Sequence, residues 1–222
     1  MVLRHDAYAR SLIPFLMRTV ACLYIDPRGP YPKLPGTDCW DEKRDARLYA
    51  GPHPVVAHPP CERWGRYWGG GPMLHGTERQ KVLGDDGGCF AAALASVRQW
   101  GGVLEHPEAS HAWKAHGLSR PPKSGGWVPA GDGGFTCCVE QGHYGHAARK
   151  ATWLYAARVE LPELTWGNAE GKTLLDEGFH SKEERARLIK TGRCQRLSRL
   201  QRIKSPVPFA ELLLNIARSS RA

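Results

Sequence analysis

Short apolar runs that stop at prolines constrain the fold of this chain more than any other feature. Residues 20–25 are apolar, β-branched or aromatic, and the next seven residues contain three prolines. A second run at 54–58 ends at two consecutive prolines, and a third begins at Val103 and terminates at 105–107. Because proline lacks an amide N–H and fixes φ, regular structure does not continue through such loops. The pattern predicts three buried strands that each run into a rigid loop.

Helical patterns alternate with these strands. We expect helices at 88–100, 181–190 and 209–218, one or two helical turns within 38–49, and a hairpin made from strands at 135–140 and 152–159. This alternation predicts an α/β layered fold with a largely parallel sheet. Ligands of such sheets bind beyond the carboxyl ends of the strands, so side chains at strand ends are the candidates for function.

The composition excludes several classes of protein. It is 41% hydrophobic with 25 glycines and 17 prolines, which is typical of a globular chain rich in turns. No stretch reaches the roughly 18 apolar residues of a membrane helix, and the apolar patch at 12–17 is too short, and broken by Pro14, for a signal peptide. We therefore expect a whole, cytoplasmic protein of one main domain with no membrane partner.

The seven cysteines have no CxxC spacing, which favours a reducing compartment over a disulfide framework. Two clusters of His and Cys, at 53–61 and 137–146, lack the ligand spacing of known zinc sites. We expect free thiols and no metal site.

The net charge of +9 is concentrated near the C-terminus, where residues 181–222 hold eleven Lys or Arg and three Glu. A basic segment beside a near-neutral body favours a polyanion partner, of which DNA is the leading candidate. Arg193, Arg196 and Arg199 recur at short intervals, a spacing that suits phosphate contacts better than base readout. The alternative is a solvated basic helix without a specific partner.

Three chemically reactive positions lie where a strand meets a loop. Cys61 follows the strand at 54–58, Glu105 closes the third strand, and Arg149-Lys150 immediately precedes the strand at 152–159. A thiol at a stiff strand end is exposed and directed, as a nucleophile must be. A nearby carboxyl group can donate a proton if burial raises its pKa, and a guanidinium can stabilise an anion.

Four segments, in order, resemble motifs of the DNA cytosine-C5 methyltransferases. Pro59-Pro60-Cys61 resembles the nucleophile motif of that family, and Leu104-Glu105-His106-Pro107 resembles its Glu-Asn-Val segment with His-Pro in place of Asn-Val. The region from His143 to Leu154 is similar to the Gln-x-Arg-x-Arg region, although we find no matching glutamine. Residues 205–213 are similar to the closing segment and its helix. Together the segments span about three quarters of the chain.

The resemblance implies a Rossmann-like methyltransferase core with a mostly parallel sheet, a β-hairpin and a reduced target-recognition region. It divides a single domain, 1–222, into a catalytic core at 20–159, a small basic recognition region at 160–204 and a closing helix at 205–222 that packs back on the core. Such compactness is typical of a phage or mobile-element modification system.

The resemblance also implies roles for the reactive residues. Cys61 would add to C6 of a pyrimidine, Glu105 would hydrogen-bond and protonate its N3 side, and Arg149 would support the base carbonyl. The base would first be extruded from the duplex, because a thiol cannot reach C6 inside the stack.

The implied methyl donor is S-adenosylmethionine, although the family's glycine-rich turn is missing after the strand at 20–25. The positions that remain for this cofactor are Asp26, Arg28, Gly29 and Asp38. The rigid loop, which carries Arg28, also suits a phosphate-bearing ligand.

Beyond the C-terminal arginines, we expect Trp64, Arg66 and Lys150 to contact DNA. The aromatic residues after Cys61 either stack on bases, or plug the space of an extruded base, or fold onto the core.

Two alternatives to a methyltransferase stay open. One is a nucleic-acid-binding relative without the cofactor, and the other is a pyrimidine-modifying enzyme that uses a different donor or a free nucleotide.

Overall fold

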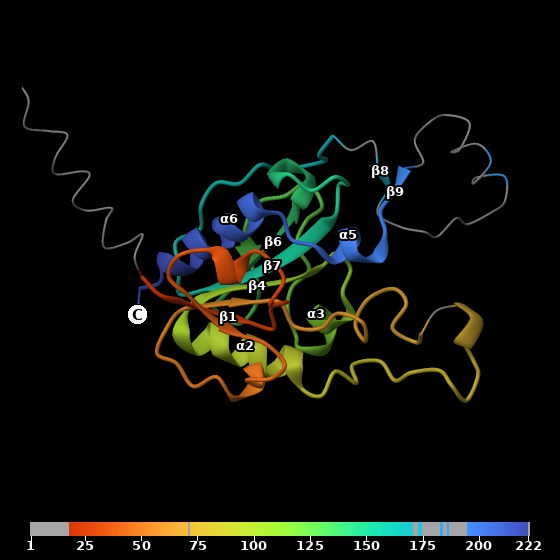
Figure 1. Ribbon diagram of the computed structural model, residues 1–222, viewed down its shortest axis with the longest axis horizontal. Coiled ribbons are helices and arrows are strands. Elements are labelled where there is room, and N and C mark those ends of the chain that lie inside the picture. Colours follow the sequence, from red (N-terminus) through yellow and green to blue (C-terminus); the bar gives the residue numbers. More distant parts are fainter. Residues whose placement is uncertain are drawn as a thin grey trace, which may run out of the picture.

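The computed structural model describes residues 18–70, 72–170, 173, 174, 183, 186 and 195–221. Its centre is one sheet of seven strands in the order β2-β1-β3-β4-β7-β6-β5, and β8 and β9 form a separate pair (Figure 1). The strands are β1 (Val20–Leu23), β2 (Thr37–Trp40), β3 (Val55–Ala57), β4 (Gly102–Pro107), β5 (Val128–Pro129), β6 (Phe135–Glu140), β7 (Ala151–Ala157), β8 (Thr173–Leu174) and β9 (Gln195–Arg196).

Among the described residues, helices are fewer than strands and mostly short. The α-helices are α2 (Cys89–Trp100), α3 (His111–Ala115), α5 (Arg199–Ile203) and α6 (Val207–Arg218). Single 3₁₀ turns are η1 (Tyr31–Lys33), η2 (Ala46–Leu48), η3 (Pro72–Leu74) and η4 (Gln141–Tyr144). In the part of the chain that the structure describes, we find no helix with the length and apolar character needed to cross a bilayer.

The sheet is mixed, so the expected α/β class is confirmed but the largely parallel sheet is not. Strands β2, β1, β3 and β4 pair in parallel, whereas β4 with β7, β7 with β6, and β6 with β5 pair antiparallel. The hairpin causes this difference, because a tight connection joins only antiparallel strands. Two successive reversals leave β6 running in the same direction as β4, so both end at the same edge of the sheet.

Two hydrophobic clusters cover the two faces of the sheet. Side chains alternate along β1, so that Ala21 and Leu23 join the cluster under α2 while Val20 and Cys22 join the cluster under α6. Both helices occupy the expected positions, and α6 packs on β1, β3 and β4. Truncation of a buried aromatic such as Phe90 to Ala would cost about 3–5 kcal/mol.

Two expected helical segments differ from the structure or lie outside it. Residues 37–40 form β2 instead of a helical turn, because their backbone pairs with β1 in a continuous parallel register. Only a 3₁₀ turn, η2, remains from the helical turns expected within 38–49. The helix expected at 181–190 and the candidate phosphate contact Arg193 lie outside the described residues, apart from positions 183 and 186.

Candidate active site

The carboxyl edge of the sheet gathers polar side chains from four strands or the loops beside them. His58 follows β3, Glu105 lies near the end of β4, Gln141 follows β6 and Lys150 precedes β7. Because β3, β4 and β6 run in one direction and β7 runs in the other, all four positions meet at the same edge. This edge is where α/β proteins bind their ligands.

Glu105 is fixed there by hydrogen bonds to both carboxylate oxygens. His58 Nδ1 lies 2.9 Å from Oε2, and Gln141 Nε2 donates to Oε1 at 3.3 Å. The other nitrogen of the His58 ring, Nε2, lies 2.7 Å from the hydroxyl of Tyr31. The side chains of Glu105 and His58 are only 12% and 14% exposed. The carboxylate is therefore held in one orientation by a continuous network from η1 to η4.

The environment of Glu105 favours its ionised form. Burial by itself raises the pKa of this carboxyl, but the hydrogen bond with His58 and the nearby charge of Lys150 outweigh burial and lower it. The condition under which Glu105 could donate a proton directly, a raised pKa, is therefore not met. To protonate a substrate, Glu105 must first take up a proton during the reaction.

Cys61 lies beside this network at the start of a fixed turn. Its carbonyl oxygen accepts hydrogen bonds from the amides of Trp64 and Gly65, both at 3.0 Å. Burial raises the pKa of the Cys61 thiol to about 11, Glu105 adds to the increase, and Lys150 opposes it. The thiol is therefore protonated near neutral pH, and attack requires that its proton be removed.

Lys150 is the cation that faces the thiol and the carboxylate. Burial lowers the pKa of its ammonium, while the charges of Glu105 and Cys61 raise it. Its backbone has a positive φ of 44°, and its carbonyl oxygen accepts a hydrogen bond from the backbone amide of Gln141 at 3.1 Å. Lys150, which the sequence analysis assigns to DNA contact, thus lies within electrostatic reach of both expected catalytic residues.

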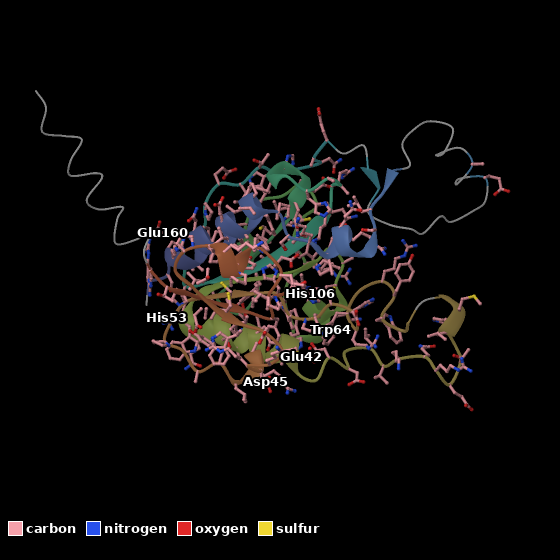
Figure 2. All side chains as sticks on the ribbon, viewed as in Figure 1. Glu42, Asp45, His53, Trp64, His106 and Glu160 are labelled. Carbon is pink, nitrogen blue, oxygen red and sulfur yellow. The ribbon has the colours of Figure 1, made fainter. Side chains whose placement is uncertain are left out.

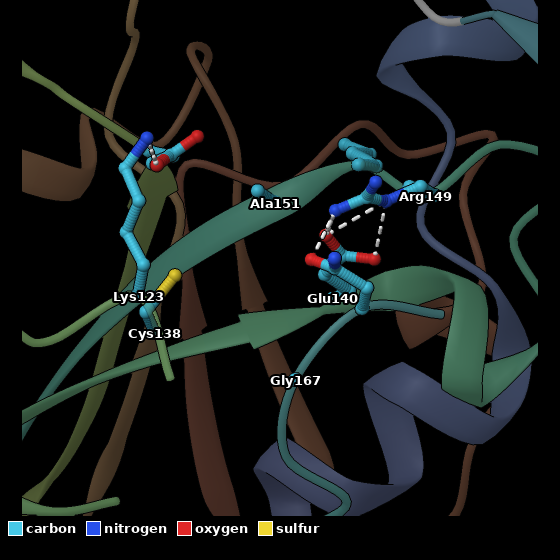
Figure 3. Close-up of a pocket in the computed structure, with 9 residues that line it drawn as sticks. Lys123, Cys138, Glu140, Arg149, Ala151 and Gly167 are labelled. Carbon is cyan, nitrogen blue, oxygen red and sulfur yellow. Dashed lines mark hydrogen bonds and ion pairs between the residues drawn. The ribbon is translucent and has the colours of Figure 1, made fainter. Parts of the chain in front are cut away.

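Arg149 points to a different place. Its Nε donates to both carboxylate oxygens of Glu140, at 3.0 and 2.9 Å, and its Nη2 contacts Asn168. Figure 3 shows Arg149 and Glu140 facing each other across one side of a pocket of about 360 Å³, with Lys123 on the opposite side. The structure therefore does not bring Arg149 to Cys61 and Glu105, because neighbouring residues at the start of β7 diverge.

Gln141 is the site residue that the sequence analysis missed. It is fully buried, and besides Glu105 its Nε2 binds the hydroxyl of Thr152 at 2.9 Å. The available signal was a glutamine directly after the strand at 135–140, two residues before the segment from His143 to Leu154 in which the resemblance lacks one.

The residues expected to hold S-adenosylmethionine already have partners within the chain. Asp26 accepts hydrogen bonds from Arg28 through the backbone amide at 2.9 Å and through the guanidinium at 3.1 Å. Asp38 accepts from Trp40 Nε1 at 2.8 Å and from Arg44 at 2.6 Å. Gly29 closes the tight turn, with its amide 2.8 Å from the Asp26 carbonyl oxygen. Both carboxylates are thus paired with arginine side chains at the surface.

Trp64 belongs to the core. It is 6% exposed, packs against Phe90, and donates its indole N–H to Asp86 at 2.8 Å. Figure 2 marks its position in the body of the molecule. The expected base contact is therefore not available to this ring, and the core alternative is correct. Arg66 lies over the exposed ring of Tyr67, 5.5 Å from its centroid.

The remaining candidates lie in the small C-terminal elements. Arg196 is in β9 and Arg199 begins α5. Within the described ranges, no three His, Cys, Asp or Glu residues form a group that suits a metal ion.

Comparisons of the chain with models of protein families, with curated proteins and with solved structures found no significant match. The functional argument therefore rests on the chemistry of the carboxyl edge.

Proposed function

We propose that this protein modifies a pyrimidine base in DNA, by group transfer to C5 of cytosine through a covalent adduct with Cys61. The observation that carries the proposal is that Cys61, Glu105 and Lys150 lie at one edge of the sheet, where two hydrogen bonds fix the Glu105 carboxylate and the charge of the partly buried Lys150 acts on both other groups. The resemblance of the Cys61 and Glu105 segments to the cytosine-C5 methyltransferases supports the same chemistry.

Each of the three groups has a role in this proposal. Cys61 Sγ forms a bond to C6 as the thiol proton passes to the Glu105 carboxylate, which then protonates N3. The electron pair of the C5–C6 double bond becomes available at C5, which attacks an electrophilic carbon of the donor while the bond from that carbon to its leaving group breaks. The C5 proton then passes to water, the thiolate is expelled as the double bond re-forms, and the N3 proton returns through Glu105 to Cys61, which restores the thiol and the carboxylate.

Lys150 takes the role that the resemblance implies for Arg149. Its ammonium is beside both reacting groups, where it stabilises the negative charge of the thiolate and supports the base carbonyl. The network through His58 and Gln141 orients the carboxylate but does not itself touch the base.

DNA is the proposed partner because the basic C-terminal elements lie near the proposed site. Gln141 and Lys150 lie at the carboxyl edge, and Gly145 directly follows η4. Pro206, which lies between α5 and α6, is within van der Waals reach of Gly145. Lys204 lies just after α5 and is exposed. Phosphate contacts from this region would hold a duplex next to Cys61.

The decisive experiment is mass spectrometry of nucleosides from DNA that has been co-expressed with the protein. We expect a modified cytosine with the native chain and none with Cys61→Ser. Purified protein with S-adenosylmethionine should also form a Cys61-dependent adduct with DNA that contains 5-fluorocytosine, because after group transfer the fluorine at C5 blocks the final elimination. Unmodified DNA together with no adduct would contradict the proposal.

The paired carboxylates beside β1 favour a second candidate, a nucleic-acid-binding protein without a methyl donor. Asp26 and Asp38 would each have to exchange a guanidinium partner to bind S-adenosylmethionine. Isothermal titration of the folded protein with S-adenosylmethionine separates the two candidates. Tight DNA binding without cofactor binding or adduct formation supports the second candidate, whereas an adduct on a free nucleotide or with another donor identifies a different pyrimidine-modifying enzyme.

A further inference from the structure

Cys22 and Cys39 face each other across the first two strands of the sheet. They are direct partners in the parallel register of β1 and β2. Both contribute to the hydrophobic cluster under α6, Cys22 as a buried member and Cys39 as a partly exposed neighbour. The two thiols therefore lie side by side on one face of the sheet.

Both thiols also point the same way along their strands. Cys22 Sγ lies 3.7 Å from the carbonyl oxygen of Val20, and Cys39 Sγ lies 3.9 Å from Thr37 Oγ1. Val20 and Thr37 are themselves partners in the register, so the two side chains lean in parallel. A hydrogen bond joins the thiols, with Cys22 as the donor. The sulfur atoms are thus already directed at each other.

The spacing of adjacent strands suits a covalent bond between these residues. Neighbouring strands lie about 4.7–4.9 Å apart, and a disulfide joins Cα atoms that are about 4.4–6.8 Å apart. Opposite residues of β1 and β2 meet this condition without a shift of either strand. The consecutive residues Cys137 and Cys138 do not, because they belong to the clusters on opposite faces of the sheet.

The two thiols of the pair differ in reactivity. The hydrogen bond from Cys22 lowers the pKa of the Cys39 thiol to about 7, and the charge of Arg44 also lowers it. The same hydrogen bond and burial raise the pKa of Cys22, which is fully buried. Cys39 therefore supplies an accessible thiolate near neutral pH, while Cys22 remains a thiol behind it.

We propose that Cys22 and Cys39 form a reversible disulfide when the protein reacts with a peroxide. The Cys39 thiolate attacks one peroxide oxygen, the O–O bond breaks, and a sulfenic acid forms while the departing hydroxide takes up the proton released by Cys39. The Cys22 sulfur then bonds to the Cys39 sulfur as the S–O bond breaks, and the hydroxyl group leaves with the Cys22 proton as water. With hydrogen peroxide, two thiols lose two electrons and the peroxide becomes two waters. A dithiol reverses the reaction by exchange.

The bond ties an edge strand to the rest of the sheet. β2 stands at one end of the strand order and pairs with β1. In the unfolded chain the disulfide closes the segment between the two cysteines, which restricts that chain more than the folded one. We therefore expect the oxidised protein to resist urea better than the reduced protein. The inference does not involve Cys61 and is independent of the proposed function.

Peptide mapping of the oxidised protein tests the proposal. The purified chain is treated with hydrogen peroxide near pH 7, the remaining thiols are alkylated in denaturant, and the unreduced tryptic digest is analysed by mass spectrometry. Trypsin places the two cysteines in different peptides, 19–28 and 34–43. We expect these peptides to be joined, with two hydrogen atoms fewer than the separate peptides, and to separate after dithiothreitol. The midpoint of urea unfolding should shift to higher concentration on oxidation.

Three variants make the test specific. Cys39→Ser should slow the oxidation of Cys22 by about tenfold or more, because a buried thiol does not reach the peroxide by itself. In Cys22→Ala, Cys39 should stop at the sulfenic acid, which dimedone traps. Cys89→Ser, which removes another partly exposed cysteine, should leave the yield of joined peptides unchanged.

Three results overturn the proposal. The first is that peptides 19–28 and 34–43 stay separate in the oxidised native chain. The second is that Cys22 is oxidised equally fast in the native chain and in Cys39→Ser, which would remove Cys39 as the attacking thiol. The third is that the joined form unfolds at a lower urea concentration, because the folded sheet would then not accommodate the bond.

Discussion

The reactivity of Cys61 depends on two charges of opposite sign that lie beside it. Glu105 raises the pKa of the thiol and Lys150 lowers it, while burial raises it most. A thiol with a pKa of about 11 supplies little thiolate near neutral pH. For this cysteine to act as a nucleophile, another group must therefore accept its proton. In the proposed mechanism the Glu105 carboxylate, which its lowered pKa keeps ionised, accepts that proton.

Substitutions at these two charges should shift the alkylation of Cys61 in opposite directions. Glu105→Gln removes a like charge and should lower the thiol pKa, so iodoacetamide should react faster at each pH between about 8 and 10. Lys150→Met should slow the reaction. Peptide mass spectrometry separates the peptide of Cys61 from those of the other cysteines. Glu211→Gln, on the exposed side of α6, is the control, and identical profiles for all variants would contradict the assignment.

The stability of the fold should depend on pH through Glu105. The pKa of this carboxyl is lower in the folded chain, so its ionised form stabilises the fold above the ordinary glutamate pKa of about 4.3. That contribution disappears as the pH falls through the folded pKa. Urea unfolding from about pH 7 to 3 should therefore show a smaller loss for Glu105→Gln than for the native chain. Equal losses in the two proteins would show that the carboxylate is not stabilised by folding.

At the scale of elements, Asp86 joins the long connection between β3 and α2 to the helix itself. One of its oxygens accepts a hydrogen bond from the Gly88 amide at 2.9 Å, and the other accepts from the amide of Phe90 and the indole N–H of Trp64. The residue thus supplies acceptors to the first turn of α2 and holds the start of the connection at the same time. The amide of His111, which donates to the Trp64 carbonyl oxygen at 2.9 Å, also holds the start of the connection to the core.

Replacement of Asp86 by Ala should therefore destabilise the protein by about 1–3 kcal/mol, because several donors lose their acceptor. Chemical denaturation of the purified variant measures the change in the free energy of unfolding. Asp85→Ala, at the exposed neighbouring position, should change stability by less than about 0.5 kcal/mol. A similar effect of the two substitutions would mean that the Asp86 contacts contribute little.

For the molecule as a whole, two apolar clusters under α2 and α6 cover the two faces of the sheet, and the loops at its carboxyl edge carry the polar groups of the site. The small C-terminal elements β9 and α5 lie on the same side of the body as the projecting connection between β3 and α2 (Figure 1). In the proposed function, this side of the body faces the DNA.

The affinity for DNA should fall with salt and depend on the C-terminal cations. In a plot of the logarithm of the DNA-binding constant against the logarithm of the salt concentration, each phosphate contact that is lost makes the negative slope shallower by about 1. We expect the double variant Arg202→Gln, Lys204→Gln to reduce this slope, as measured by fluorescence anisotropy with a mixed-sequence duplex. Lys33→Gln, on η1, should leave it unchanged. A salt slope that is the same for the native chain and the double variant would remove these residues from the interface.

The sequence by itself determined the local elements and the strand ends. The prolines that follow β1 and β3 end these strands whatever the strand order of the sheet. The spacing of apolar residues at 88–100 and at 209–218 likewise specifies an amphipathic helix in any fold. For the same reason Cys61 and Glu105 were identified as strand-end residues before their surroundings were known.

Only the tertiary structure decided which side chains meet. Whether Arg149 or Lys150 faces Cys61 depends on backbone geometry at the start of β7, and the two residue types carry the same charge in the sequence. The partnership of Gln141 with Glu105 joins positions 36 residues apart, and it exists because β7 and β6 pair beside β4. Such contacts depend on strand order, which local propensity does not specify.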